Sequence, residues 1–132
     1  MQDSRSLILA YVNAFNRGDL DALCALFAPD ALIWGVLGFG RIDQVRSIWQ
    51  DLIECLQIQL QVDSLICEGN SVAVRFTERG KSAKPFRSHR QTGCSYEIIA
   101  IEWFEVKDGL IHRHWGVRDS ASVWQQLQFS PQ

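Results

Sequence analysis

One apolar stripe constrains the fold of this chain more than any other feature. Six apolar residues are spaced at i, i+3, i+4, i+7, i+8 and i+11: Val45, Ile48, Trp49, Leu52, Ile53 and Leu56. This spacing puts all of them on one continuous face of a helix. Because a stripe of that size must be buried against a large surface, we expect the rest of the chain to form that surface.

The chain that follows this helix is predicted to form an antiparallel meander. Ile58, Leu60 and Val62 alternate with polar residues, which is typical of a strand with one buried face. The Asp108–Gly109 pair between two apolar runs is a strong hairpin signal. The predicted strands cover residues 58–62, 72–76, about 95–106 and 110–117.

Two shorter helices and a short strand are predicted before the stripe. Apolar residues recur at helical spacing from Ser6, and Gly18 supplies the expected stop. Asp19 can cap a second short helix, which Pro29 should break. An extended run over 31–34 follows. The order of helices and strands indicates an α+β domain.

Two further segments have weaker patterns. Residues 36–40 contain glycines that suit a loop over an opening, and residues 120–127 are expected to form a last helical turn or two. At 132 residues, of which 47% are hydrophobic, the chain has room for a single domain over 1–132 and a substantial core.

Charge and cysteine usage limit the partners and the compartment. The net charge of −2 gives no attraction to a polyanion or an acidic membrane, so neither nucleic acid nor a membrane is an expected partner. The four cysteines lie far apart, and no signal-peptide pattern or long apolar run is present. These features predict reduced thiols and a cytoplasmic protein.

Three segments resemble the SnoaL-like polyketide cyclase family: YVNAFNRGDLDALCALFAPDA (11–31), LICEGNSVAVRFTERG (65–80) and EIIAIEWFEVKDGLIHRHWGVRD (97–119). The family belongs to the nuclear transport factor 2-like superfamily. The resemblance implies a cone-shaped fold in which three N-terminal helices pack on a strongly curved mixed, mostly antiparallel sheet around one deep pocket. It also implies a homodimer and a cofactor-independent cyclase or isomerase acting on a small hydrophobic carbonyl compound that is polyketide-like or steroid-like.

The resemblance also implies the site residues. Family members use an aspartate four residues after the tryptophan of an H-W-x-x-x-D pattern, which is Asp119 here. The chain further resembles ketosteroid isomerase, whose pocket tyrosine and pocket acid match Tyr11 and Glu102. The catalytic aspartate of that isomerase has no counterpart, since Ile33 and Trp34 stand where it would fall.

We expect Asp119 to be the acid/base, because an apolar pocket raises the pKa of a carboxyl toward working pH. Tyr11 and a protonated Glu102 would donate hydrogen bonds to the developing enolate oxygen. His114 would orient Asp119 or pass the proton onward. Arg118 is placed near the mouth. The side chains expected to shape the pocket are Phe15, Trp34, Trp49, Trp103 and Trp115.

Strand geometry assigns faces to the segment around His114. Residues at i and i+2 point the same way in a strand, so one row is predicted to face the pocket. That row is His112, His114, Gly116 and Arg118.

Structural alternatives remain open for each of these residues. Asp119 is also placed to cap a helix over 120–127, Glu102 to lie on a solvated strand face, and Tyr11 to be an ordinary core tyrosine. His112, His114 and His89 are a weak candidate for a metal site that we do not expect to be real. The basic loop Arg79–Arg90 is either a solvated crossing or a rim that attracts an anion.

Two other functions compete with the cyclase. A non-catalytic domain that binds a small molecule or docks a protein fits the apolar pair Ile33 and Trp34. Epoxide hydrolysis by a held water needs two pocket acids, for which Asp119 and Glu102 are the candidates, and it ranks below both.

Overall fold

A computed structural model describes residues 3–35 and 38–129 of the chain. The helices of this part are α1 (Ser4–Asn16), α2 (Leu20–Ala25), α3 (Ile42–Leu56) and α4 (Ser120–Leu127). The strands are β1 (Phe27–Gly35), β2 (Gly38–Gly40), β3 (Gln59–Glu68), β4 (Ser71–Lys81), β5 (Ser95–Lys107) and β6 (Leu110–Arg118). Within the described residues, every helix is too short or too polar to cross a membrane.

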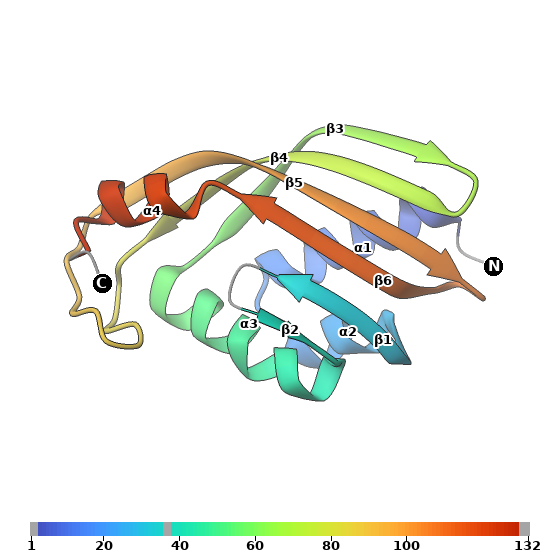
Figure 1. Ribbon diagram of the computed structural model, residues 1–132, viewed down its shortest axis with the longest axis horizontal. Coiled ribbons are helices and arrows are strands. Elements are labelled where there is room, and N and C mark those ends of the chain that lie inside the picture. Colours follow the sequence, from blue (N-terminus) through green and yellow to red (C-terminus); the bar gives the residue numbers. More distant parts are fainter. Residues whose placement is uncertain (1–2, 36–37, 130–132) are drawn as a thin grey trace.

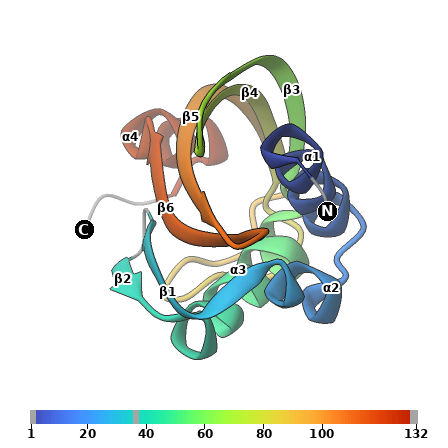
Figure 2. The same cartoon turned by 90° about the vertical axis from the view of Figure 1, so that its right-hand side faces the viewer.

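The strands form one mixed sheet in the order β2-β1-β6-β5-β4-β3. β1 and β6 pair in parallel, and the other neighbours pair antiparallel. Figure 1 shows the long strands running over the helices, and Figure 2 shows the sheet curved into an arch with α1, α2 and α3 on its inner side. The α+β cone predicted from the sequence is confirmed.

The first three helices form for the reasons that their sequences suggest. Asp3 caps α1 by accepting a hydrogen bond from the backbone N–H of Ser6, and Asp19 caps α2 in the same way. Gly18, with φ of 71°, lies directly between the two helices as predicted. The apolar stripe of α3 faces the inside of the arch, where Trp49 and Leu56 are buried.

The region around residue 30 differs from the prediction. α2 ends at Ala25, and β1 already begins at Phe27 and includes Pro29. Pro29 is tolerated because the pairing of β1 with β6 is irregular between Phe27 and Leu32, so no ladder hydrogen bond needs its missing N–H. The expected loop over 36–40 is in part the short strand β2, while residues 36 and 37 lie outside the described residues.

A register shift between β5 and β6 changes which residues of β6 face the inside of the arch. Glu105 of β5 pairs with Arg113, but the next residue, Val106, pairs with Ile111, so His112 is an extra residue on β6. His112 therefore leaves the inward row, and its Nδ1 lies 3.8 Å from Asp30 of β1. The part of the row that follows the bulge faces inward as expected.

Candidate active site

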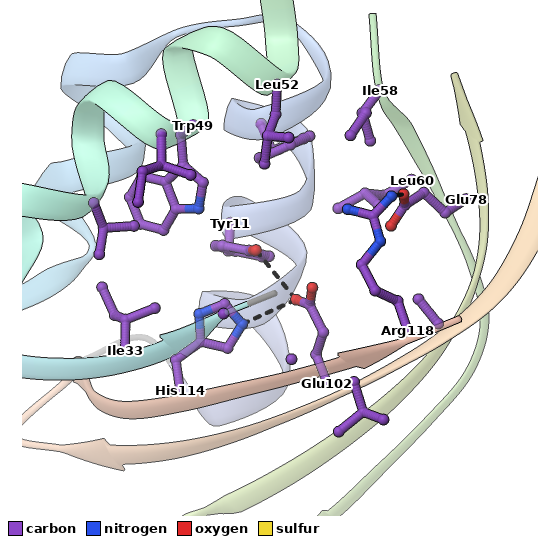
Figure 3. A pocket seen from close by; sticks show the side chains of 17 residues that line it. Tyr11, Ile33, Trp49, Leu52, Ile58, Leu60, Glu78, Glu102, His114 and Arg118 are labelled. Carbon is purple, nitrogen blue, oxygen red and sulfur yellow. Dashed lines mark hydrogen bonds and ion pairs between the residues drawn. The ribbon is translucent and has the colours of Figure 1, made fainter. Parts of the chain in front are cut away.

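A cavity lies between the inner face of the sheet and helices α1 and α3 (Figure 3). Its cavity volume is about 70 Å³, and the hollow as a whole, counted out through its open mouth into solvent, is about 710 Å³. Its wall is mostly apolar. Its lining residues are Tyr11, Phe15, Ile33, Gly35, Val45, Ile48, Trp49, Leu52, Ile58, Leu60, Glu78, Ala100, Glu102, His114, Gly116, Val117 and Arg118. Of the predicted site residues, six contribute to this wall: Tyr11, Phe15, Trp49, Glu102, His114 and Arg118.

Glu102 is the centre of the first polar group in the cavity. Its Oε1 atom accepts a hydrogen bond of 3.1 Å from the Tyr11 hydroxyl and lies 3.0 Å from Nε2 of His114. Its Oε2 atom makes no hydrogen bond to any described residue, and Figure 3 shows it directed toward the middle of the cavity. One carboxylate oxygen is thus held while the other is free to meet a ligand.

The alternation of β5 places Glu102 on the inner face. Ala100 and Phe104, two residues away on either side, are buried on the same face, so the solvated-face alternative for Glu102 is wrong. Gly116 lies opposite Glu102 on β6, and a Cβ at position 116 would make an ordinary van der Waals contact with Oε2, at 3.6 Å.

Tyr11 is fully buried on α1, and its hydroxyl is committed to Glu102. Burial and the neighbouring Glu102 carboxyl hold the pKa of this hydroxyl well above its ordinary value. Tyr11 therefore remains a neutral donor. In this arrangement Glu102 accepts the hydrogen bond, whereas the sequence predicted that Glu102 would itself be a donor beside Tyr11.

His114 is held between aromatic rings. Its imidazole stacks on Phe104 with ring centres 4.4 Å apart and meets the edge of Tyr11 at 5.4 Å. The residue is only 4% exposed, and its Nδ1 is the one buried side-chain nitrogen or oxygen among the described residues that lacks a hydrogen bond. With a proton on Nε2, the ring donates to Glu102 and leaves no buried N–H unpaired.

A second polar group lies farther along the cavity. Arg118 of β6 donates from Nη2 to the Tyr96 hydroxyl at 2.9 Å and forms an ion pair with Glu78 of β4. The Tyr96 hydroxyl also donates to Glu78, which is 3% exposed. The ring of Tyr96 packs against Gly80, where a Cβ would overlap it.

Sequence reasoning missed Glu78 and Tyr96. The signal was present for Glu78, because it continues the buried alternation of Val72, Val74 and Phe76 on β4. A carboxylate in an inward row requires a partner, and Arg118 was already predicted to face inward. Tyr96 likewise begins the inward row of β5.

Burial controls the ionisation of this second group. It raises the pKa of the Glu78 carboxyl, and this effect outweighs the lowering effect of Arg118 and Tyr96. Burial together with Glu78 also raises the pKa of the Tyr96 hydroxyl, so that Tyr96 stays a donor. The nearby Glu102 carboxyl adds to the rise in the pKa of Glu78.

Glu78→Gln tests this assignment through the pH dependence of stability. The folded protein holds a proton on Glu78 at a higher pH than the unfolded chain does. The stability that this difference contributes is therefore fully present below about pH 4.5, the ordinary pKa of a glutamate carboxyl. As the pH rises through the folded pKa, wild type should therefore lose stability relative to Glu78→Gln. Urea unfolding at several pH values between 4 and 8 measures the difference. A gain of wild type over the variant with rising pH would show that the pKa is lowered.

Asp119 lies outside the cavity wall. It is exposed, and its Oδ1 accepts a hydrogen bond of 3.0 Å from the backbone N–H of Ser122 as the N-cap of α4. β6 ends at Arg118, and the chain turns there into the helix, so the Asp119 carboxylate faces the first turn of α4. The prediction that Asp119 enters the pocket is wrong, and the helix-cap alternative describes its position.

Three predicted pocket tryptophans lie on the outer face of the sheet. Trp34 stacks on Trp115 with ring centres 5.0 Å apart and planes 3° from parallel, and Trp103 is paired in register with Trp115. Each directly follows an inward residue, so alternation turns it outward. The prediction that Trp34, Trp103 and Trp115 shape the cavity is wrong.

The histidines and the basic loop do not form the sites considered for them. His89 stacks on Phe129 at 4.2 Å, far along the chain from His112 and its contact with Asp30. Throughout the described part, no three His, Cys, Asp or Glu side chains gather in a way that suits a metal ion. Arg79 pairs with Glu97 at 2.7 Å on the outside, and no residue of 79–90 lines the cavity.

Comparisons with known proteins agree with this fold. IdmH from Streptomyces antibioticus, described as "a putative polyketide cyclase", is 26% identical, with a TM-score of 0.84 over 96% of this chain and 99% of its own. A protein from Xanthomonas campestris pv. campestris with the same description is 24% identical, with a TM-score of 0.87 over 94% of this chain and 96% of its own, and shows the shared fold. A search of curated proteins finds no significant match. The model of the SnoaL-like domain matches residues 8–114, and the chain therefore belongs to this family.

Proposed function

We propose that this protein is a cofactor-independent cyclase or isomerase that uses Glu102 as its acid/base on a hydrophobic carbonyl compound. The observation that carries the proposal is the Glu102 carboxylate, with Oε1 held by Tyr11 and His114 and with Oε2 free in an apolar cavity. Family membership and the description of IdmH as a putative polyketide cyclase support this reaction class.

The reaction needs one proton carrier. Glu102 Oε2 takes a proton from a carbon beside a carbonyl, and the electrons of that C–H bond form an enolate. In a cyclase, the enolate carbon then bonds to a second carbonyl carbon of the same molecule, and the new alkoxide takes the proton back from Glu102. In an isomerase, the proton returns to another carbon. No electrons enter or leave the substrate.

The surrounding side chains have supporting roles. Tyr11 and His114 hold the carboxylate in place through Oε1. Trp49 lines the cavity, and its indole N–H has no partner among the described residues. Figure 3 shows this nitrogen on the side that faces Tyr11, where it can donate to an enolate oxygen.

Deuterium exchange tests the proposal without knowledge of the natural substrate. The probe is 2-tetralone, an apolar bicyclic ketone with an acidic CH₂ group between its ring and its carbonyl. We expect wild type to speed exchange of these protons in D₂O above the buffer rate, with saturation in 2-tetralone, as followed by NMR. Exchange at the buffer rate, with 2-tetralone bound, would overturn the proton-transfer role.

Binding of 2-tetralone with exchange at the buffer rate is the result expected for the competing function, non-catalytic binding of a small apolar molecule. One observation favours it. Ile33 gives this part of the wall no carboxylate, and the polar side chains of the wall are already paired with one another. The same measurement separates the two functions, because a binding domain lowers the free 2-tetralone concentration without changing its exchange rate per free molecule.

We also propose that the protein forms a homodimer through the outer face of β5 and β6. Four apolar side chains there are 45% to 70% exposed: Ile99, Ile101, Trp103 and Val117. Contiguous apolar exposure of this kind marks an association surface. We expect light scattering to give about twice the chain mass of 15.1 kDa for wild type and one chain mass for Ile101→Lys. Leu9→Lys, on the exposed side of α1, is the matched control and should stay dimeric. A monomeric wild type would refute the proposal.

A further inference from the structure

The ion pair of Arg118 with Glu78 faces the cavity and not the solvent. The Arg118 side chain is 11% exposed and that of Glu78 is 4% exposed, and both residues line the wall. A buried ion pair contributes little stability that apolar residues of similar size would not also give. Stability alone therefore does not account for the pair in an otherwise apolar wall, and its hydrogen-bonding groups are placed where a ligand can reach them.

Arg118 has hydrogen-bond donors that no described residue uses. A guanidinium carries five N–H donors, and the bonds to Tyr96 and Glu78 are made by Nη2 alone. Its other nitrogens make no hydrogen bond to a described residue. Glu78 neutralises the charge, so Arg118 presents hydrogen-bond donors without a net positive charge.

This group lies at a distance from the proton carrier. Glu102 is opposite Gly116 on β6, and Arg118 is two residues farther along that strand, which is about 7 Å between the backbone positions. Figure 3 shows Arg118 and Glu78 on the side of Glu102 away from His114 and Ile33. Apolar residues fill the wall around them: Leu52, Ile58, Leu60 and Ala100.

We propose that Arg118, fixed by Glu78 and Tyr96, binds a second, neutral oxygen of the substrate, a carbonyl or a hydroxyl, at the end of an apolar body opposite the carbon that Glu102 deprotonates. This inference rests on the proposed function for the role of Glu102, and it names the substrate class as an apolar molecule with an oxygen at each end. A carboxylate fits less well, because Glu78 cancels the charge of Arg118 and Glu102 adds a negative charge nearby.

Binding of matched naphthalene probes tests this inference. Naphthalene-2,6-diol carries a hydroxyl at each end, 2-naphthol carries one, and 6-hydroxy-2-naphthoate replaces one hydroxyl by a carboxylate. We expect wild type to bind the diol about tenfold more tightly than 2-naphthol, as one added hydrogen bond gives, and more tightly than the naphthoate. Titration followed by calorimetry or fluorescence gives the dissociation constants.

The variant for comparison is Glu78→Gln/Arg118→Met, which removes both charges together and so leaves neither buried alone. Circular dichroism and thermal unfolding verify that it is folded. We expect the preference for the diol over 2-naphthol to disappear in this variant.

The inference is overturned if wild type fails to bind the diol, if it shows no preference, or if the double variant keeps the preference. Tighter binding of the naphthoate than of the diol overturns the neutral-oxygen assignment. Failure of the acid/base role of Glu102 appears separately, as wild-type exchange of 2-tetralone at no more than the buffer rate while the diol preference is still present.

Discussion

Glu102→Gln is expected to slow the deuterium exchange of 2-tetralone by about a hundredfold to ten-thousandfold, the range that a positioned acid/base supplies. Glutamine keeps the shape of the side chain, and its carbonyl oxygen still accepts the hydrogen bonds that Tyr11 and His114 give to Oε1. It cannot take a proton from carbon. We therefore expect the dissociation constant for 2-tetralone to change by only a few-fold while the exchange rate collapses.

Asp119→Asn is the matched control for this experiment. Asparagine caps helices as well as aspartate does, so α4 should keep its N-cap bond to Ser122. Exchange of 2-tetralone should continue at the wild-type rate. If Asp119→Asn stops exchange and Glu102→Gln does not, the proton carrier is Asp119 and the assignment to Glu102 fails.

Arg118→Met is expected to lower the free energy of unfolding by about 3–5 kcal/mol at pH 7, the cost of leaving one member of a buried ion pair alone. Glu78 would keep only the Tyr96 hydroxyl as a partner in a buried position. The loss should be smaller at pH 5, because a Glu78 carboxyl whose pKa is already raised by burial can then take up a proton. Urea unfolding at the two pH values measures both effects.

The double variant Glu78→Gln/Arg118→Met gives the decisive comparison. With no charge left in the group, most of the stability lost in Arg118→Met should return. The result would be contradicted if the double variant were as unstable as the single one, since the loss would then come from packing of the long Arg118 side chain and not from the uncompensated carboxylate.

The fold was predictable because its main signals are local and periodic. The α3 stripe, the cap at Asp19 and the hairpin at Asp108–Gly109 each depend on residues a few positions apart. The errors arose where a distant strand decided the outcome. Phe27 belongs to a strand because it pairs with Ile111 of β6, and no local pattern indicates that pairing.

The candidate site was predictable only in part, for a related reason. Glu102 and His114 follow from alternation and from the resemblance to related pockets, and the structure brings them together. The prediction misplaced Asp119 because strand alternation does not fix the direction of a side chain just past the end of a strand. Its carboxylate instead accepts the N-cap hydrogen bond of the helix that begins there. The bulge at His112 is likewise invisible in the sequence, although it sets which residues of β6 face inward.

The position of β6 has a consequence for how the protein matures. This strand comes late in the sequence, yet it fills the gap between β1 and β5 in the middle of the sheet. Without β6, the strand order leaves β2-β1 and β5-β4-β3 as two separate sheet fragments, and the facing edges of β1 and β5 are then unpaired and can join to another molecule. β6 also carries His114 and Arg118, so both polar groups of the cavity are incomplete until this strand joins the sheet. Insertion of β6 therefore does two things together: it covers the edges of β1 and β5, and it adds His114 and Arg118 to the cavity.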